Sequence, residues 1–153
     1  MKYGVCLALF DEIKGPYVVY RHNVSESAAL KIAIKTIISG GTLQTYDLYE
    51  ADSISAVPEE NLVTFFRYFA FKNKDDRASL TPASICFVAP LSEQLNVYRD
   101  APHLSEIAIN IVGKLKKVLQ GLNELNIHKI EEVFNWLFSN RILSNLPSNL
   151  QDS

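Results

Sequence analysis

Two short segments of this chain are apolar on both faces, and they constrain the fold more than any other feature. Residues 2–10 ("KYGVCLALF") and 83–91 ("ASICFVAPL") carry apolar side chains at odd and at even positions. Because successive side chains of a β-strand point to opposite sides of a sheet, such a strand must be covered on both sides. The sequence therefore predicts two central strands with helices on both faces of their sheet.

Three further segments are predicted to be strands. Residues 16–22 ("PYVVYRH") are rich in β-branched and aromatic residues, and Pro16 places them at a strand start or a sheet edge. Residues 42–51 alternate weakly, whereas residues 61–73 alternate strongly, with large apolar side chains on both faces. With the two central strands, these segments predict a five-stranded, mostly antiparallel sheet.

Three segments have the period of an amphipathic helix. Residues 23–41 begin with Asn23 and Glu26 at the spacing of a capping box and end at two glycines, which are typical of a left-handed stop. Two later helices are expected at about residues 103–120 and 126–140, while residues 92–102 stay unassigned. One stripe of the first helix is predicted to face the sheet. It consists of larger apolar residues and one alanine, namely Leu30, Ala33, Ile34, Ile37 and Ile38.

The order of these elements predicts the fold class. The order is strand, strand, helix, strand, strand, strand, helix, helix, which gives an α/β (more narrowly α+β) domain with three layers, α/β/α. The first helix is expected on one face of the sheet and the last two on the other. Residues 1–140 are expected to form a single domain, and residues 141–153 a polar, frayed C-terminal tail.

No group of residues is arranged for catalysis, for a metal or for a cofactor. Asp11 and Glu12 stand in the loop "DEIKGP", but neighbouring side chains of an extended segment point apart, and a hairpin turn closed by Gly15 accounts for the loop. The three histidines lack partners at the spacing of metal ligands, apart from generic pairs such as His128 with Glu131 or Glu132. The formal net charge is -2, and no aromatic residues interleave with the lysines of "KLKK", so we expect no nucleic-acid partner.

The sequence also predicts a cellular compartment. No apolar run is long enough to span a membrane, and the first residues lack the pattern of a signal peptide. Cys6 and Cys86 each lie in an apolar run, which is typical of buried free thiols in a reducing compartment. We therefore expect a cytoplasmic protein that has no integral membrane segment and is not an enzyme.

One face of the first helix is predicted to bind another protein. Outside the predicted inward stripe, this helix carries small or uncharged residues and one protruding isoleucine. Its two lysines lie along one flank only. The candidate partner-binding residues on this face are Ala28, Ala29, Ile32 and Thr36. Such a smooth surface suits close packing against another chain, although small residues can also stand there without a role. Trp136 falls roughly 60° outside the inward stripe of its helix. It can either anchor a partner or cap the edge of the core.

The chain resembles the longin domain over nearly its whole length. The resemblance rests on the order of the elements and on the "GP" turn of "FDEIKGPYVVY", which is followed by an apolar second strand. The related roadblock fold places a helix before its first strand. The resemblance implies a longin/profilin-like fold without enzymatic activity or cofactor, acting as a scaffold in vesicle trafficking. It further implies a protein partner, either a small GTPase or another longin- or roadblock-type subunit, or a homodimer. Binding would use the first helix and the neighbouring edge strand.

In this sequence the pairing helix of the longin domain matches Ile32 and its small neighbours, and the edge strand matches residues 43–49. The predicted partner-binding residues are therefore Ala28, Ala29, Ile32, Thr36, Leu43, Tyr46, Tyr49 and Trp136. The alternative is a small-ligand sensing domain of the PAS or GAF kind, which requires an enclosed cavity between sheet and helices. The many large aromatic side chains predict a filled core instead.

Overall fold

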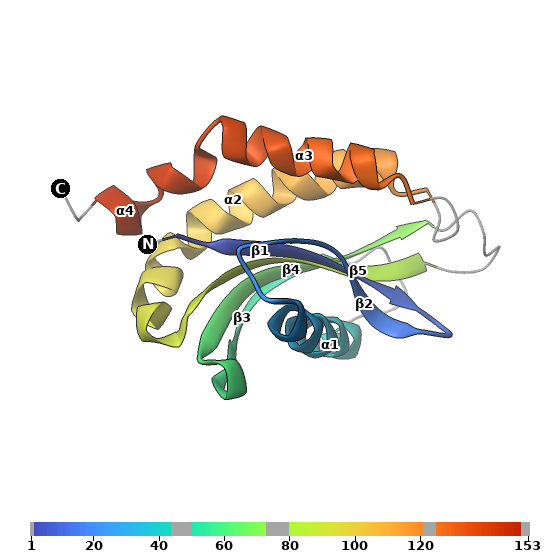
Figure 1. Cartoon of the computed structure of the whole chain (residues 1–153), viewed down its shortest axis with the longest axis horizontal. Coiled ribbons are helices and arrows are strands. Elements are labelled where there is room, and N and C mark those ends of the chain that lie inside the picture. The colour runs from blue at the N-terminus through green and yellow to red at the C-terminus, as the bar shows by residue number, and fades with distance from the viewer. Residues whose placement is uncertain (1, 44–49, 73–79, 121–124, 151–153) are drawn as a thin grey trace.

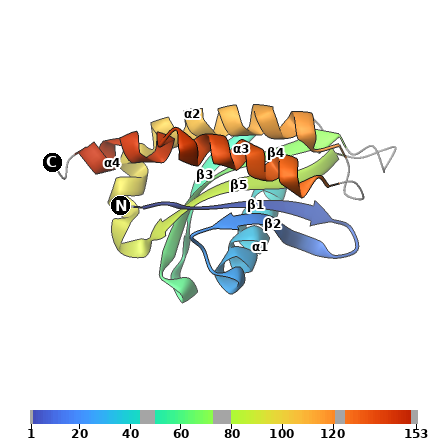
Figure 2. The same ribbon diagram turned by 45° about the horizontal axis from the view of Figure 1, so that its top comes forward.

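A computed structural model describes residues 2–43, 50–72, 80–120 and 125–150 of the chain. A five-stranded sheet lies between two helical layers, with α1 on one face and α2 and α3 on the other (Figure 1). Figure 2 shows the same arrangement from a second direction. The elements are β1 (Gly4–Asp11), β2 (Gly15–His22), α1 (Glu26–Leu43), β3 (Ala51–Val57), β4 (Leu62–Lys72), β5 (Leu80–Pro90), α2 (Gln94–Val118), α3 (Ile127–Ser139) and α4 (Pro147–Leu150).

The strands lie in the order β2-β1-β5-β4-β3, and each strand is antiparallel to its neighbours. This places β1 and β5 inside the sheet, as their two apolar faces predict. Cys6 is paired directly with Cys86 in the register of these two strands. The prediction of a three-layer α/β/α fold with a mostly antiparallel sheet is confirmed.

The two faces of the sheet have cores of different size. The larger core lies beneath α2 and α3, where Leu7, Phe69 and Phe87 are fully buried. The core beneath α1 contains fewer and smaller side chains, including Ala29 and Ala33. Alternate residues of β1, β4 and β5 supply the two cores, as the period of two requires.

The loop between β1 and β2 is a hairpin turn, as predicted. The carboxylate of Asp11 accepts hydrogen bonds from the backbone N–H groups of Ile13 (2.7 Å) and Lys14 (3.2 Å). These two bonds lower the pKa of Asp11. Gly15 has a φ of 77° and pairs with Asp11 at the end of the ladder. A three-residue turn followed by a left-handed glycine explains the loop, and the carboxylate of Asp11 serves the backbone.

The first helix extends further than its glycines predict. α1 passes through both glycines and ends at Leu43, so the predicted strand at residues 42–51 is wrong at its start. Residues 44–49 lie outside the described residues, and β3 begins at Ala51. Gly40 is needed for packing rather than for a stop, because a Cβ atom there would lie 1.8 Å from the ring of Tyr68.

The second long helix begins earlier than predicted. Residues 92–102, which the sequence analysis left unassigned, continue from a short 3-10 turn (Leu91–Glu93) into α2. Pro102 therefore stands inside the helix, although proline favours the first helical turn. Figure 1 shows the first turns of α2, in yellow, at an angle to the rest of the helix. α3 lies within one residue of its predicted limits.

Residues 142–150, which were expected to belong to a frayed tail, are packed against the domain. Residues 142–145 form a 3-10 turn and residues 147–150 the short helix α4. Leu146 is buried in the large core. The backbone N–H and the hydroxyl of Ser148 both donate to the buried carboxylate of Asp100, at 2.9 and 2.5 Å. Apolar and polar contacts together hold this segment, which composition alone does not reveal.

Candidate interaction surface

The structure turns α1 so that four predicted partner-binding residues face the sheet. Ala28, Ala29, Ile32 and Thr36 are between 0% and 3% exposed. The hydroxyl of Thr36 donates to the carbonyl of Ile32 at 2.8 Å and shares a hydrogen bond of 2.8 Å with the hydroxyl of Ser84. The prediction that these four residues face outward is therefore wrong.

The physical reason is the close approach of α1 to the sheet. Both sides of this helix are apolar, so hydropathy alone does not distinguish them. Small residues on the inner side let the helix backbone lie near the strands, and the satisfied hydroxyl of Thr36 carries no burial penalty. Of the five residues predicted to face inward, Ala33 and Ile37 are buried, and the other three, which are large and apolar, are left outside. The alanines at positions 28, 29 and 33 are the signal that could have identified the inner face.

Three large apolar side chains line the outer side of α1. Leu30, Ile34 and Ile38 are 45%, 41% and 59% exposed. Their spacing of four residues places them in one row about 12 Å long, because a helix rises about 1.5 Å per residue. We call these three residues the α1 stripe. The sequence analysis assigned them to the core, so it missed the apolar surface that the structure presents.

The two lysines of α1 are both engaged on the β3 side of the helix. The ammonium group of Lys31 pairs with Glu60 at 2.5 Å, and that of Lys35 donates to the carbonyl of Ala56. The carboxylate of Glu60 raises the pKa of Lys31. These contacts draw both charges toward β3, so the α1 stripe is not interrupted by a lysine.

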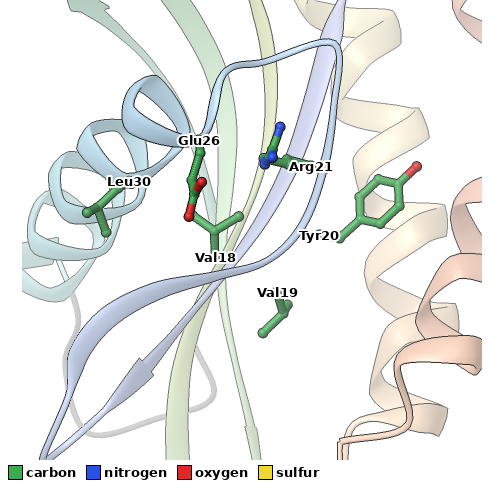
Figure 3. A pocket seen from close by; sticks show the side chains of 6 residues that line it. All are labelled: Val18, Val19, Tyr20, Arg21, Glu26 and Leu30. Carbon is green, nitrogen blue, oxygen red and sulfur yellow. The ribbon is translucent and has the colours of Figure 1, made fainter.

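A groove of about 350 Å³ lies between α1 and the edge strand β2, beside Leu30 (Figure 3). Figure 3 shows the side chains of Val18 and Glu26 between these two elements. Tyr20 points to the other side of the sheet, where its ring stacks on that of Phe134 with centroids 4.0 Å apart. The remaining lining residues are Val19 and Arg21. The apolar row on α1 therefore borders a groove that has one basic and one acidic side chain.

The outer edge of β2 is poorly suited to pairing with another strand. Leu7 pairs with Tyr20 and Ala8 with Val18, so Val19 is an extra residue that forms a bulge. Pro16, near the start of β2, has no N–H group to donate. Bulges and prolines are features that protect a sheet edge against strand addition. The accessible surface at this side of the molecule is therefore the helix and the groove.

The remaining predicted residues do not join this surface. Trp136 belongs to α3, on the opposite face of the sheet, where it is partly buried against the large core. The ammonium group of Lys114 lies 4.5 Å from the centre of its ring. These contacts match the core-capping alternative. Leu43 ends α1, and its side chain lies outside the described residues, as do Tyr46 and Tyr49.

Two further observations concern the part of the chain that the structure describes. Within it, no three side chains of His, Cys, Asp or Glu lie close enough together to hold a metal ion. None of the described helices is both long and apolar enough to cross a membrane.

The layers and the strand order define a class of domain, the three-layer α/β/α fold with an antiparallel sheet of order β2-β1-β5-β4-β3. Among solved structures, the chain is similar to the K. lactis Lst4 longin domain, with a TM-score of 0.63 and 18% sequence identity. The likeness covers 93% of this chain and 94% of that one. The chain therefore has a longin-like fold, which confirms the resemblance seen in its sequence. No family model matches the sequence, and no curated protein matches it.

Proposed function

We propose that this protein is a non-enzymatic, cytoplasmic interaction module of longin type that binds a protein partner through the α1 stripe. The observation that carries the proposal is the row of three exposed apolar side chains on a helix whose other side is fully buried. The partner is a small GTPase or another longin- or roadblock-type subunit of a trafficking assembly. A second copy of the chain is the homodimeric form of the same proposal.

Apolar surface that stays in contact with water is unfavourable in free energy, and a partner that covers it removes this cost. Burying an aliphatic side chain of this size stabilises a complex by about 1.5–3 kcal/mol relative to full exposure. Leu30, Ile34 and Ile38 are about half exposed, so each retains part of that free energy for a partner. Arg21 and Glu26, in the adjacent groove, offer polar contacts that can fix the partner's orientation. An apolar centre with a polar rim is typical of protein interfaces.

The ligand-sensing alternative is less well supported. Phe65, Phe69 and Phe87 are buried between the sheet and α2, so large side chains occupy the region where a PAS- or GAF-like domain holds its ligand. A second groove, of about 320 Å³, lies where β1 begins and β5 ends, and it is open to solvent like the first. Small-molecule sites generally enclose most of their ligand. A protein partner fits these surfaces better.

The test replaces residues of the stripe with aspartate. Ile34→Asp with Ile38→Asp places two charges on the row without touching the buried face of α1. Ile109→Asp is the matched control, since Ile109 is 50% exposed on α2. We expect light scattering and quantitative affinity capture from native lysate to show partner binding weakened by about 30-fold or more in the double variant and unchanged in the control.

Thermal unfolding separates loss of binding from loss of folding. Both variants should melt within a few degrees of the wild type, because all the substituted side chains are at least 41% exposed. If the double variant retains the same assembly state and the same captured proteins as the wild type, the α1 stripe is not the binding surface. Ile32→Asp, which the sequence alone suggests, would unfold the protein because Ile32 is fully buried.

A further inference from the structure

Cys6 and Cys86 are directly opposite each other on the two central strands. Both side chains are fully buried, on the face of the sheet that α1 covers, and both are free thiols. Directly paired residues of antiparallel strands have Cα atoms about 4.5–5.5 Å apart. A disulfide needs Cα atoms about 4.4–6.8 Å apart. The register of β1 and β5 therefore holds the only two cysteines of the sequence at a Cα spacing that allows a disulfide without a change of fold.

The surroundings of the pair are polar, although they are buried. The Sγ atom of Cys86 lies 3.7 Å from the hydroxyl oxygen of Ser84 and 3.8 Å from that of Thr36. Burial raises the pKa of Cys86, but its hydrogen bonds with Cys6, Ser84, Thr36 and Thr64 outweigh burial and lower the pKa. The hydrogen bond to Cys86, together with burial, raises the pKa of Cys6. Of the two thiols, Cys86 therefore gives up its proton more readily than Cys6.

We propose that Cys6 and Cys86 are a redox-sensitive pair that closes into an intramolecular disulfide when the protein meets a peroxide. The thiolate of Cys86 attacks one oxygen of hydrogen peroxide and becomes a sulfenic acid, releasing hydroxide, which takes up the proton that Cys86 had lost. The sulfur of Cys6 then attacks the sulfur of Cys86, the S–S bond forms, and the sulfenic oxygen leaves as water with the proton of Cys6. Two thiols lose two electrons, and one peroxide is reduced to two waters.

Access to the pair depends on α1. The core beneath this helix contains fewer buried residues than the core beneath α2 and α3, so lifting α1 exposes less apolar surface than separating α2 and α3 from the sheet. A molecule as small as hydrogen peroxide reaches the thiols during such an opening. The bond then joins β1 to β5 and closes a loop of about 80 residues, which removes freedom from the unfolded chain. This inference does not rest on the proposed partner surface.

The test is oxidation of the native protein with hydrogen peroxide at neutral pH. We expect intact mass to fall by two hydrogen atoms, both thiols to become resistant to alkylation, and peptide mapping to join Cys6 to Cys86. A thiol reductant should restore both free thiols. The oxidised protein should melt about 5–10 °C higher than the reduced one. Two alkylatable thiols after oxidation, or a bond formed only between chains or only in denaturant, would overturn the proposal.

Variants test the order of the steps. Cys6→Ala should stop at a sulfenic acid on Cys86, which a cyclic dione reagent traps, and Cys86→Ala should give no such product. Ser84→Ala should form the bond several-fold more slowly, because the hydroxyl that accepts the hydrogen bond of the Cys86 thiol is lost. Ser27→Ala, at an exposed position of α1, is its control. The comparison of Ser84→Ala with Ser27→Ala keeps both cysteines, so it remains informative if a cysteine variant fails to fold. Equal rates in Ser84→Ala and wild type would overturn the assignment of Cys86 as the attacking thiolate.

Discussion

Gly40 occupies a helical position where alanine is favoured by about 1 kcal/mol in isolated helices. The ring of Tyr68, on β4, explains its presence. The nearest ring atom lies 1.8 Å from where a Cβ atom at residue 40 would be, and two further ring atoms lie within 2.7 Å. Tyr68 is itself 1% exposed and burial raises its pKa. The helix backbone therefore lies directly on the face of an aromatic ring, and only glycine permits this contact.

Gly40→Ala should destabilise the protein although it improves helix propensity. The methyl group must displace a buried ring, which typically costs about 1–3 kcal/mol. The matched control is Gly113→Ala, because a Cβ atom at this exposed position of α2 meets nothing within 4 Å. The control should be stabilised by about 0.5–1 kcal/mol. Urea unfolding of both variants gives the two free energies. Stabilisation by both substitutions would contradict the described contact between α1 and Tyr68.

The contact between α1 and Tyr68 also explains why the inner side of α1 could not be predicted from the sequence. Hydropathy and period predicted correctly that β1 is buried on both faces, because apolar side chains occupy its odd and its even positions. On α1, large apolar residues lie on the outer side, and the inner side combines small residues with Ile32 and Ile37. Which side faces inward depends on Tyr68, Ser84 and other residues distant in sequence, so the local pattern favours the wrong side. The α1 stripe was missed for this reason.

At the scale of elements, a group of charged side chains fastens α2 to the edge of the sheet near β3. Glu50 accepts from Arg67 of β4 at 3.1 Å and from Lys116 of α2 at 2.6 Å. Asp52 accepts from Arg67 at 2.8 Å and from the hydroxyl of Ser105 at 2.5 Å. Burial alone would raise the pKa of Glu50, but the bonds from Lys116 and Arg67 outweigh it and lower the pKa.

This network predicts a loss of stability in acid. Because the pKa of Glu50 is lower in the folded than in the unfolded protein, its contribution is fully present above the ordinary glutamate value of about 4.3 and is lost as the pH falls below it. The contribution should be about 1 kcal/mol, as the pairs are partly exposed. Urea unfolding of wild type and Glu50→Gln at pH 7 and pH 3.5 measures it.

The free energies of unfolding of wild type and Glu50→Gln should differ at pH 7 and become similar at pH 3.5. Glu106→Gln, at an exposed position of α2, serves as the control and should match the wild type at both. A difference between Glu50→Gln and wild type that stays constant with pH would show that ionisation of Glu50 is not responsible.

Whole elements were predicted well where a single period persists over many residues. Four of the five strands and the three long helices follow from such runs. The strand predicted at residues 42–51 shares only its last residue with β3, the start of α2 was placed too late, and α4 was not predicted. The first two errors occur at glycine or proline residues that usually end helices but here lie inside them. Their positions depend on tertiary packing, which local patterns do not contain.

At the scale of the whole molecule, Asp100 joins three distant parts of the chain. Its carboxylate on α2 accepts from the hydroxyl of Tyr3 at 2.7 Å and from two groups of Ser148. Burial and the bond to Asp100 raise the pKa of Tyr3. Asp100 is fully buried, so these three donors are what compensates its removal from water. The residue just before β1 and the last helix are thus held at one point on α2.

Truncation after residue 140 should destabilise the domain, contrary to the boundary that the sequence suggests. It removes two of the three donors to Asp100 and uncovers the core around Leu146. Loss of these hydrogen bonds and of the core contacts should lower the free energy of unfolding by about 3–5 kcal/mol. Ser148→Ala, which removes only the hydroxyl, should cost about 1–2 kcal/mol. Thermal and urea unfolding of both proteins measure these effects, and a truncated protein as stable as the full chain would contradict the described contacts.

The place of β1 in the sheet has a consequence for biosynthesis. β1 is made first, but one of its two neighbours is β5, and Cys86 follows Cys6 by 80 positions. At roughly 5–20 residues per second, a ribosome needs about 4–16 s to make that interval. During this time β1 can pair only with β2, and an isolated two-stranded hairpin is marginally stable in water. β1, which is buried along most of its length in the finished protein, therefore lacks one of its two strand partners until β5 has been made.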